Sequence, residues 1–222
     1  ECIRYCVDRV NKRVPVIAGT GSNDTKYAVD LSVEAEKLGA DALLVVTPYY
    51  NKTSQRGLIA HFTAIADSVN IPIILYNVPS RTGVNIALDT YDALANHKNI
   101  CAVKEASGNI SAIAKIIEKC GGRLDVYSGK GVISVLSNVC PKETHEIAQL
   151  CLDNNVAAAA EMQIKYLELI NYLFMDVNPI PVKEAMNLMG FSAGECRLPL
   201  LRMEQSKIGV LAASMKKVGV IK

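Results

Sequence analysis

Five apolar runs alternate with helical patterns along the first part of this chain, and this repeat limits the folds open to it. The runs begin at Val14, Ala42, Ile71, Ile100 and Leu124, which are roughly 25–30 residues apart. Each run is apolar throughout, as expected of a strand that is covered on both faces. Strands that alternate with helices at this spacing predict parallel β-α-β units in an α/β sheet.

Helices are expected between these runs because apolar residues recur there every three to four positions. The expected helices are 25–38, 57–69 and 109–120, with further helical patterns at 144–152, 157–174 and 181–189. Asn23-Asp24-Thr25 is a start signal for the first helix, and Gly39 follows its end. Gly121-Gly122 closes the third helix in the same way.

Polar side chains stand at the C-terminal end of each apolar run. They are Thr20, Thr47, Tyr49, Tyr50, Tyr76, Asn77, Lys104, Glu105 and Ser128. This edge carries the active site in a (β/α)8 barrel, although a doubly wound sheet also binds ligands there. The Gly19-Thr20-Gly21 turn is a weak match to a dinucleotide loop, because Asp24 stands where the third glycine should be.

Lys104 carries the most chemical information of these residues. It follows a buried strand, where an ammonium is costly unless it is paired or loses its proton. A lysine with an unperturbed pKa of ~10.4 is neutral in only about one molecule in 2,500 at pH 7. Burial can lower that pKa by ~3–5 units. Two interpretations are open at this point: an imine-forming nucleophile, or a structural lysine paired with a carboxylate.

Composition excludes several classes of protein. No uninterrupted apolar run approaches the ~20 residues that span a membrane. The chain has no Trp, three Phe and no basic cluster, so nucleic acid is not an expected partner. Three dispersed histidines make metal ligation unexpected. Seven cysteines without C-x-x-C spacing indicate reduced thiols in a cytoplasmic protein, most of them packed in the core.

Two features do not fit a complete barrel. The first strand opens at Val14, after a helix-like segment, so earlier strands are missing from the sequence. LDVYSG then runs directly into KGVISVLSN, although neighbouring parallel strands need a crossover of roughly a dozen or more residues. Either these two runs are not neighbouring parallel strands, or a βα segment is missing at Gly129–Lys130. We favour the second alternative.

With these residues in view, the chain resembles the dihydrodipicolinate synthase family, in the class I pyruvate aldolase superfamily that includes N-acetylneuraminate lyase. The resemblance runs from about Val14 to Leu200, through VIAGTGSN, TPYYNK, ILYNVPSRTG, VKEASGN, KGVISV, NPIPVK and RLPL. Arg81 and the KEASGN form of the lysine motif favour the synthase within the superfamily. The resemblance implies a (β/α)8 TIM barrel, incomplete over residues 1–140. Residues 141–222 would form the last barrel helix and a C-terminal helical appendage.

The resemblance also implies a reaction: pyruvate condenses with L-aspartate 4-semialdehyde to 4-hydroxy-tetrahydrodipicolinate, the first committed step of diaminopimelate and lysine biosynthesis. Lys104 would hold pyruvate as an imine, so no other cofactor and no metal are expected. Tyr76 would shuttle protons, and Tyr50 would complete the relay from a neighbouring subunit. The alternatives are another pyruvate-dependent aldolase, of the 2-keto-3-deoxy sugar acid or sialic acid type, and a non-catalytic truncated relative.

Other positions match the substrate sites of the family. Arg81 would bind the carboxylate of the aldehyde substrate, because a guanidinium suits bidentate recognition. Ile133 would offer a backbone carbonyl near pyruvate, and Gly129 would sit beside the second substrate. Glu105 points to the opposite face of its strand from Lys104 and is not expected in catalysis.

Three further expectations follow from the resemblance. The family's GTTGE segment, which supplies the relay threonine, is absent. Asn23 and Tyr49 match positions that line a regulatory lysine site, but Tyr27 stands where sensitive members carry a Glu. We therefore expect weak or no inhibition by lysine. The active enzyme of the family is usually a homotetramer built as a dimer of dimers.

Overall fold

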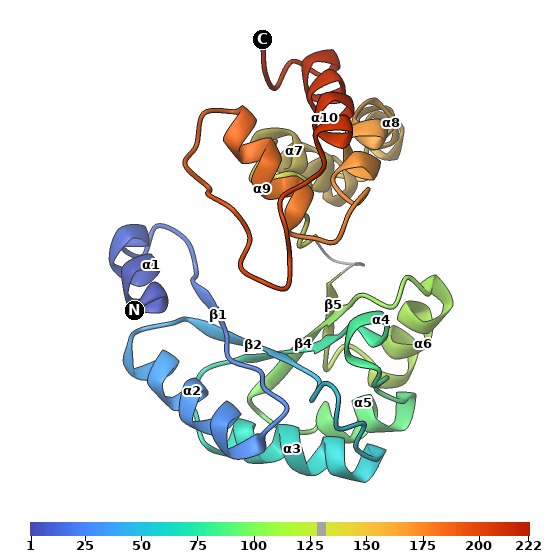
Figure 1. The fold of residues 1–222 in the computed structure, drawn as a ribbon. Coiled ribbons are helices and arrows are strands. Elements are labelled where there is room, and N and C mark those ends of the chain that lie inside the picture. The colour runs from blue at the N-terminus through green and yellow to red at the C-terminus, as the bar shows by residue number, and fades with distance from the viewer. Residues whose placement is uncertain (128–131) are drawn as a thin grey trace. The chain divides into compact units, whose positions relative to one another are not determined.

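The computed structural model describes residues 1–127 and 132–222, which belong to two compact units, Glu1–Gly131 and Val132–Lys222 (Figure 1). The predicted division of the chain after residue 140 stays a prediction. In the described ranges, no helix is long and apolar enough to cross a membrane.

The first unit is a parallel sheet with helices between its strands. The strands are β1 (Ile17–Gly19), β2 (Ala42–Val46), β3 (Ile73–Asn77), β4 (Ile100–Glu105) and β5 (Asp125–Tyr127). The helices are α1 (Cys2–Val10), α2 (Thr25–Lys37), α3 (Gln55–Asp67), α4 (Pro79–Thr82), α5 (Leu88–Leu94) and α6 (Ile110–Cys120). The predicted helices between strands are confirmed to within two residues at each end. The expected start signal is also confirmed, since the Asp24 carboxylate accepts a hydrogen bond from Tyr27 N at the start of α2.

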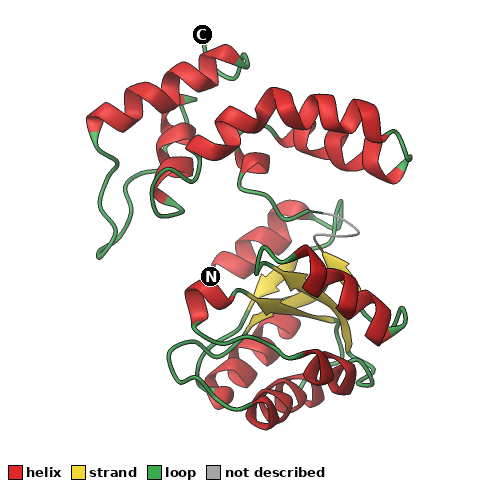
Figure 2. Cartoon of the chain, turned by 90° about the vertical axis from the view of Figure 1, so that its right-hand side faces the viewer, coloured by secondary structure: helices red, strands yellow, loops and turns green. Residues whose placement is uncertain are grey.

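The winding of this unit is that of a barrel. The strands lie in chain order, β1-β2-β3-β4-β5, and each neighbouring pair is parallel. The helices α2, α3, α5 and α6 pack on one another in sequence, as Figures 1 and 2 show. A doubly wound sheet reverses its strand order and carries helices on both faces. A sequential order with one helical layer is the arrangement of a (β/α)8 barrel.

The two faces of the sheet have different side chains because successive residues of a strand point to opposite sides. Against the helices lie Leu43, Val45, Ile73, Leu75 and Val103, each 0% exposed. These residues and the apolar stripes of the helices form the core of the first unit. The opposite face carries the barrel-lining side chains, among them Tyr76 and Lys104, which pair across β3 and β4.

The run that follows β5 is not a strand where the structure describes it. Residues 132–135 form no strand, and Leu136–Asn138 form a short 3₁₀ helix, η1. VISV therefore does not form the strand that the sequence pattern suggests. Gly129–Lys130, where a missing segment is predicted, lies outside the described residues.

The second unit is helical. Its helices are α7 (Pro141–Leu152), α8 (Val156–Tyr172), α9 (Ile180–Leu188) and α10 (Gln205–Lys217). The first three are confirmed predictions, and α10 is an additional helix. The unit has its own core, with Leu169, Leu173, Leu211 and Met215 fully buried.

The prediction that most cysteines pack in the core is wrong. Cys2, Cys6, Cys101 and Cys151 are exposed, and Cys120 and Cys140 are buried. Cys2 and Cys6 belong to α1, which buries none of its residues. All seven cysteines are free thiols.

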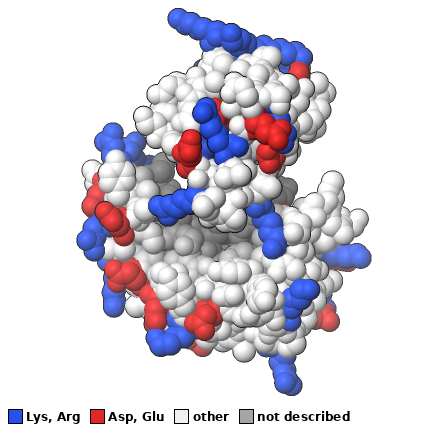
Figure 3. Space-filling view, viewed as in Figure 1, with Lys and Arg blue, Asp and Glu red and all other residues white. Residues whose placement is uncertain are grey.

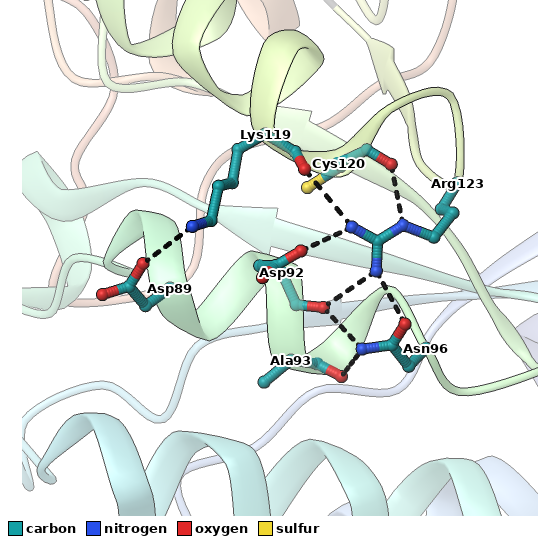
Figure 4. Close-up of polar contacts among 7 residues, drawn as sticks. All are labelled: Asp89, Asp92, Ala93, Asn96, Lys119, Cys120 and Arg123. Atoms are coloured by element: carbon teal, nitrogen blue, oxygen red, sulfur yellow. Dashed lines mark hydrogen bonds and ion pairs between the residues drawn. The ribbon is translucent and has the colours of Figure 1, made fainter.

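Arg123 ties α5 to the end of α6 (Figure 4). Its Nε donates to Cys120 O at 2.9 Å, at the C-terminus of α6. One Nη atom donates to the Asp92 carboxylate on α5, and the other donates to Asn96 Oδ1 just after that helix. The hydrogen bond from Arg123 lowers the pKa of Asp92. One guanidinium thus fixes two neighbouring crossover helices behind β4.

Charge on the first unit is mixed in sign. On the face drawn in Figure 3, basic side chains are interspersed with acidic ones over this unit.

The folded chain should lose stability as pH falls below about 6.5, through His61. This side chain is buried on α3, with Nδ1 2.9 Å from Thr25 Oγ1 and Nε2 without a partner among the described residues. Burial lowers its pKa, so the unfolded chain binds this proton more readily than the folded chain. Stability is therefore complete above the unfolded pKa and falls as pH drops through it, by at most about 1.4 kcal/mol per pH unit. The measurement is Tm at pH 7.5 and 5.5, with His61→Gln as the control that should flatten the slope. An equal slope in both proteins would contradict the assignment.

Candidate active site

Tyr76 and Lys104 form the centre of the candidate site. They are a register pair at the carboxyl ends of β3 and β4, and both point away from the helices. Lys104 Nζ lies 4.3 Å from the centroid of the Tyr76 ring. Both side chains are half-buried. The structure therefore brings together the two residues on which the sequence hypothesis depends.

The surroundings of Lys104 favour a reactive amine over a structural cation. Burial lowers the pKa of Lys104 below its usual value, because the ammonium loses hydration there. Among the described residues Lys104 makes no ion pair. A structural lysine at this depth would need a carboxylate partner. Partial desolvation without a carboxylate partner raises the fraction of Lys104 that is a neutral, nucleophilic amine.

A cavity of ≈ 430 Å³ opens beside Tyr76. It is lined by Gly19, Gly21, Leu44, Val46, Tyr49, Tyr76, Val78, Arg81 and Thr82. Gly21 lies so close to β2 that an added Cβ would be 2.4 Å from Val46 N, so this position requires glycine. Apolar walls with a few polar groups are typical of a small-molecule site.

Arg81 and Tyr50 line a second, adjoining cavity of ≈ 720 Å³. Arg81 lies on α4, which directly follows β3, and its side chain is exposed. Tyr50 is 87% exposed and has a positive φ of 70° in the loop after β2. Tyr49, Arg81 and Thr82 line both cavities.

Thr82 links the end of α4 to the segment that follows β2, and the sequence analysis did not identify it. Its Oγ1 accepts a hydrogen bond from Thr47 Oγ1 at 3.1 Å, and its carbonyl accepts one from Tyr50 N at 3.3 Å. The side chain is buried. Its place directly after Arg81 in the PSRTG turn is the sequence signal that could have identified it.

Asn23 and Tyr49, the two residues predicted to line a regulatory site, both accept hydrogen bonds from Asn51. Asn51 Nδ2 donates to Asn23 O at 3.0 Å, and Asn51 N donates to Tyr49 O at 2.8 Å. Tyr27 is exposed at the start of α2, four residues after Asn23. Whether this group binds lysine stays a prediction.

Two predicted substrate contacts cannot be related to Lys104. Ile133 is exposed and belongs to the second unit. Gly129 lies outside the described residues. Both assignments stay predictions. In the part of the chain that the structure describes, no group of His, Cys, Asp and Glu has the arrangement of a metal site.

Comparisons with known proteins agree on one family. A model of the dihydrodipicolinate synthetase family matches residues 1–218. The 4-hydroxy-tetrahydrodipicolinate synthase of Clostridium perfringens (strain SM101) is 53% identical over 235 residues, covering 100% of this chain and 81% of the relative. The corresponding synthase 1 of Clostridium acetobutylicum is 52% identical and covers 100% and 80%. A crystal structure of dihydrodipicolinate synthase from Aquifex aeolicus superimposes with a TM-score of 0.96 at 41% identity, covering 99% of this chain and 80% of that one.

These likenesses bear on two predictions about the fold. The solved relatives are TIM barrels, so the predicted (β/α)8 fold is confirmed. The alignment with the Clostridium perfringens protein spans 235 residues, 13 more than the 222 of this chain. The relative therefore carries residues without a counterpart here, as expected if a segment is missing from this sequence.

Proposed function

The chain belongs to the dihydrodipicolinate synthetase family, whose members are pyruvate-dependent lyases of lysine biosynthesis, and we propose how its residues divide the reaction. The reaction joins pyruvate to L-aspartate 4-semialdehyde and gives 4-hydroxy-tetrahydrodipicolinate. The observation that carries the proposal is Lys104: a half-buried lysine without an ion pair among the described residues, at a strand end beside Tyr76.

Lys104 is the nucleophile. Its neutral amine adds to the keto carbon of pyruvate, the carbinolamine loses water, and a C=N bond to Nζ remains. The protonated imine withdraws electrons from the adjacent methyl group, which can then lose a proton to give an enamine. The enamine carbon attacks the aldehyde carbon of the second substrate, the new C–C bond forms, and the aldehyde oxygen takes up a proton to become the hydroxyl group. The amino group of the second substrate then adds to the imine carbon, which closes the ring and expels Lys104 as a free amine. No cofactor beyond this covalent imine is part of the proposal.

Tyr76 moves the protons of these steps. Its ring lies next to Lys104 Nζ, so its hydroxyl is within the same site as the carbinolamine and the methyl group. A phenol with a pKa of ~10 needs a relay partner to act as a base at neutral pH. Tyr50 is the proposed partner, supplied by a second copy of the chain. Its high exposure supports this, because a relay tyrosine has to be covered by another segment to work.

Arg81 recognises the carboxylate of the aldehyde substrate. Its exposed guanidinium lines the rim of both cavities, where a second substrate would reach the enamine. Ile133 O is proposed near pyruvate and Gly129 near the second substrate. We further propose a homotetrameric, cytoplasmic enzyme with weak or no response to lysine at Asn23 and Tyr49.

Replacing Arg81 by lysine should raise KM for aspartate semialdehyde about tenfold or more and leave KM for pyruvate nearly unchanged. A lysine keeps the charge but loses the planar pair of donors that grips a carboxylate, worth roughly 1.5–3 kcal/mol. The measurement is steady-state kinetics with each substrate varied in turn. Arg56→Lys, on the exposed surface of α3, is the matched control. Equal changes in both KM values would argue against a role in recognising the aldehyde.

The experiment that tests the function is borohydride trapping. The chain is incubated with pyruvate, reduced with borohydride and digested, and the mass adduct is located by peptide sequencing. We expect the adduct on Lys104. A chain that turns over no pyruvate with aspartate semialdehyde and traps none on Lys104 would exclude the proposal. Assays with sugar aldehydes in place of the semialdehyde separate this synthase from other pyruvate aldolases.

A further inference from the structure

A buried polar cluster lies directly behind Tyr76 and Lys104, on the helix-covered face of the sheet. It consists of Asn77, Glu105 and Tyr91, which we call the Glu105 cluster. These side chains are 1%, 3% and 1% exposed. Asn77 follows Tyr76 on β3, and Glu105 follows Lys104 on β4, so their side chains point to the opposite face.

The cluster is densely hydrogen-bonded. Asn77 Nδ2 donates to both oxygens of Glu105, at 3.1 and 3.0 Å. Tyr91 OH, on α5, donates to Glu105 Oε2 at 2.8 Å, and Ser107 N donates to Oε1 at 2.9 Å. Burial, with the Glu105 charge next in importance, raises the pKa of Tyr91, so its hydroxyl keeps the proton it donates. A buried carboxylate satisfied in this way holds its donors tightly.

The cluster lies at the end of a strand pair whose register changes along its length. Ile73 pairs with Ile100, whereas Ile74 pairs with Ala102, so β3 and β4 shift by one residue between these positions. The pairing at the carboxyl ends is therefore not dictated by the pairing at the start. A slip of one residue would turn a strand's side chains to the other face. The Asn77–Glu105 pair sits one step beyond Tyr76–Lys104 and secures that end of the ladder.

The cluster also reaches the segment after α4. Asn77 Oδ1 accepts a hydrogen bond from Ile86 N at 3.2 Å, and Asn77 Nδ2 donates to Asn85 Oδ1 at 2.9 Å. This segment continues from the helix that carries Arg81. The same buried groups thus anchor the strand ends that carry Lys104 and Tyr76. They also anchor the segment that follows Arg81.

We propose that Glu105, held by Asn77 and Tyr91, is a positioning residue of the reaction: it sets Tyr76 opposite Lys104 by fixing the register of the two strand ends. The inference rests on the proposed function of Lys104 and Tyr76. Glu105 touches neither substrate, and its effect passes through the backbone of β3 and β4. Misplacing reacting groups by about 1 Å can cost about a hundredfold in rate.

The test compares Glu105→Gln and Tyr91→Phe with Asn99→Ala. Asn99 is the matched control because its buried amide also holds β4, but at the opposite end, where it donates to Ala66 O at 3.0 Å and Val69 O at 2.7 Å. For each variant, Tm, KM for pyruvate, kcat and the rate of borohydride-trapped imine formation are measured. A purely structural role would lower Tm alone.

We expect the rate of imine formation and kcat to fall about 10- to 100-fold in Glu105→Gln and about threefold or more in Tyr91→Phe. KM for pyruvate should change less than the rates. Asn99→Ala should lose comparable Tm and keep both rates. If Glu105→Gln does not fold, Tyr91→Phe decides, since it removes one hydroxyl from a packed ring.

Unchanged rates in a Tyr91→Phe or Glu105→Gln protein whose Tm has fallen like that of Asn99→Ala would overturn the inference. This outcome differs from a failure of the proposed function, in which the unsubstituted chain itself traps no pyruvate on Lys104. The trapping experiment on the unsubstituted chain is therefore done first.

Discussion

Replacing Lys104 by methionine should abolish the pyruvate adduct and reduce turnover to the background of the assay. Methionine fills a similar volume but has no amine, so the carbinolamine and the imine cannot form. The half-buried position and the contact with the Tyr76 ring would be kept by the unbranched thioether side chain. Intact-protein mass after borohydride reduction and the coupled synthase assay are the two measurements.

Lys98→Met is the matched control, because Lys98 is exposed just before the same strand. It should trap pyruvate on Lys104 as the unsubstituted chain does. An adduct that persists in Lys104→Met, or that appears on Lys98 in the unsubstituted chain, would place the nucleophile elsewhere.

The same substitution should leave the fold at least as stable at neutral pH. Burial lowers the pKa of Lys104, so folding disfavours its charged form. This cost is present in full below the folded pKa, declines as pH rises through it, and is gone above the pKa of the unfolded chain. Methionine removes the cost, and Tm should therefore not fall. A chemical group that is retained at the expense of stability is expected at an active site.

Replacing Tyr76 by phenylalanine should lower kcat about 10²- to 10⁴-fold while the imine still forms. The substitution keeps the ring under Lys104 and removes the hydroxyl that carries protons, a contribution of that size for general acid–base catalysis. The measurements are steady-state kcat and the yield of borohydride adduct at long incubation. A loss of kcat with an unchanged adduct yield identifies a proton carrier, whereas a loss of both would indicate a packing residue.

Tyr127→Phe is the matched control for Tyr76→Phe. Tyr127 lies on the other side of Lys104, as its register partner on β5. Its hydroxyl has no part in the proposal, so kcat should change by less than about threefold, the range of a modest surface or packing effect. Equal losses in the two variants would show that any hydroxyl beside Lys104 matters, and would remove the specific role of Tyr76.

The sheet and most helices could be predicted because each depends on local pattern. Apolar runs covered on both faces identify β2, β3 and β4, and the cap at Asp24 marks the start of α2. α10 was not predicted. Gly209 interrupts its pattern, and glycine inside a helix costs about 1 kcal/mol relative to alanine. Packing of Ile208, Leu211 and Met215 into the second core offsets that cost.

The candidate site could be predicted only where its residues stand on neighbouring strands. Tyr76 and Lys104 meet because parallel strand ends share one edge, which the sequence pattern already implies. Thr82 and Tyr91 come from helices, and their contacts with Thr47 and Glu105 depend on how those helices pack. Ile133 belongs to the second unit, so no local pattern relates it to the strand ends of the first.

The one-residue shift between β3 and β4 divides the strand pair into two zones with different registers. Bulges and register irregularities are common next to active sites, where they aim side chains without changing the rest of a strand. We expect conservative substitutions near Ile73 and Ile100, before the shift, to change stability more than the geometry of Tyr76 and Lys104. The geometry above it stays under the control of Asn77 and Glu105. Stability and the aim of the reacting groups would then be set by different parts of one strand pair.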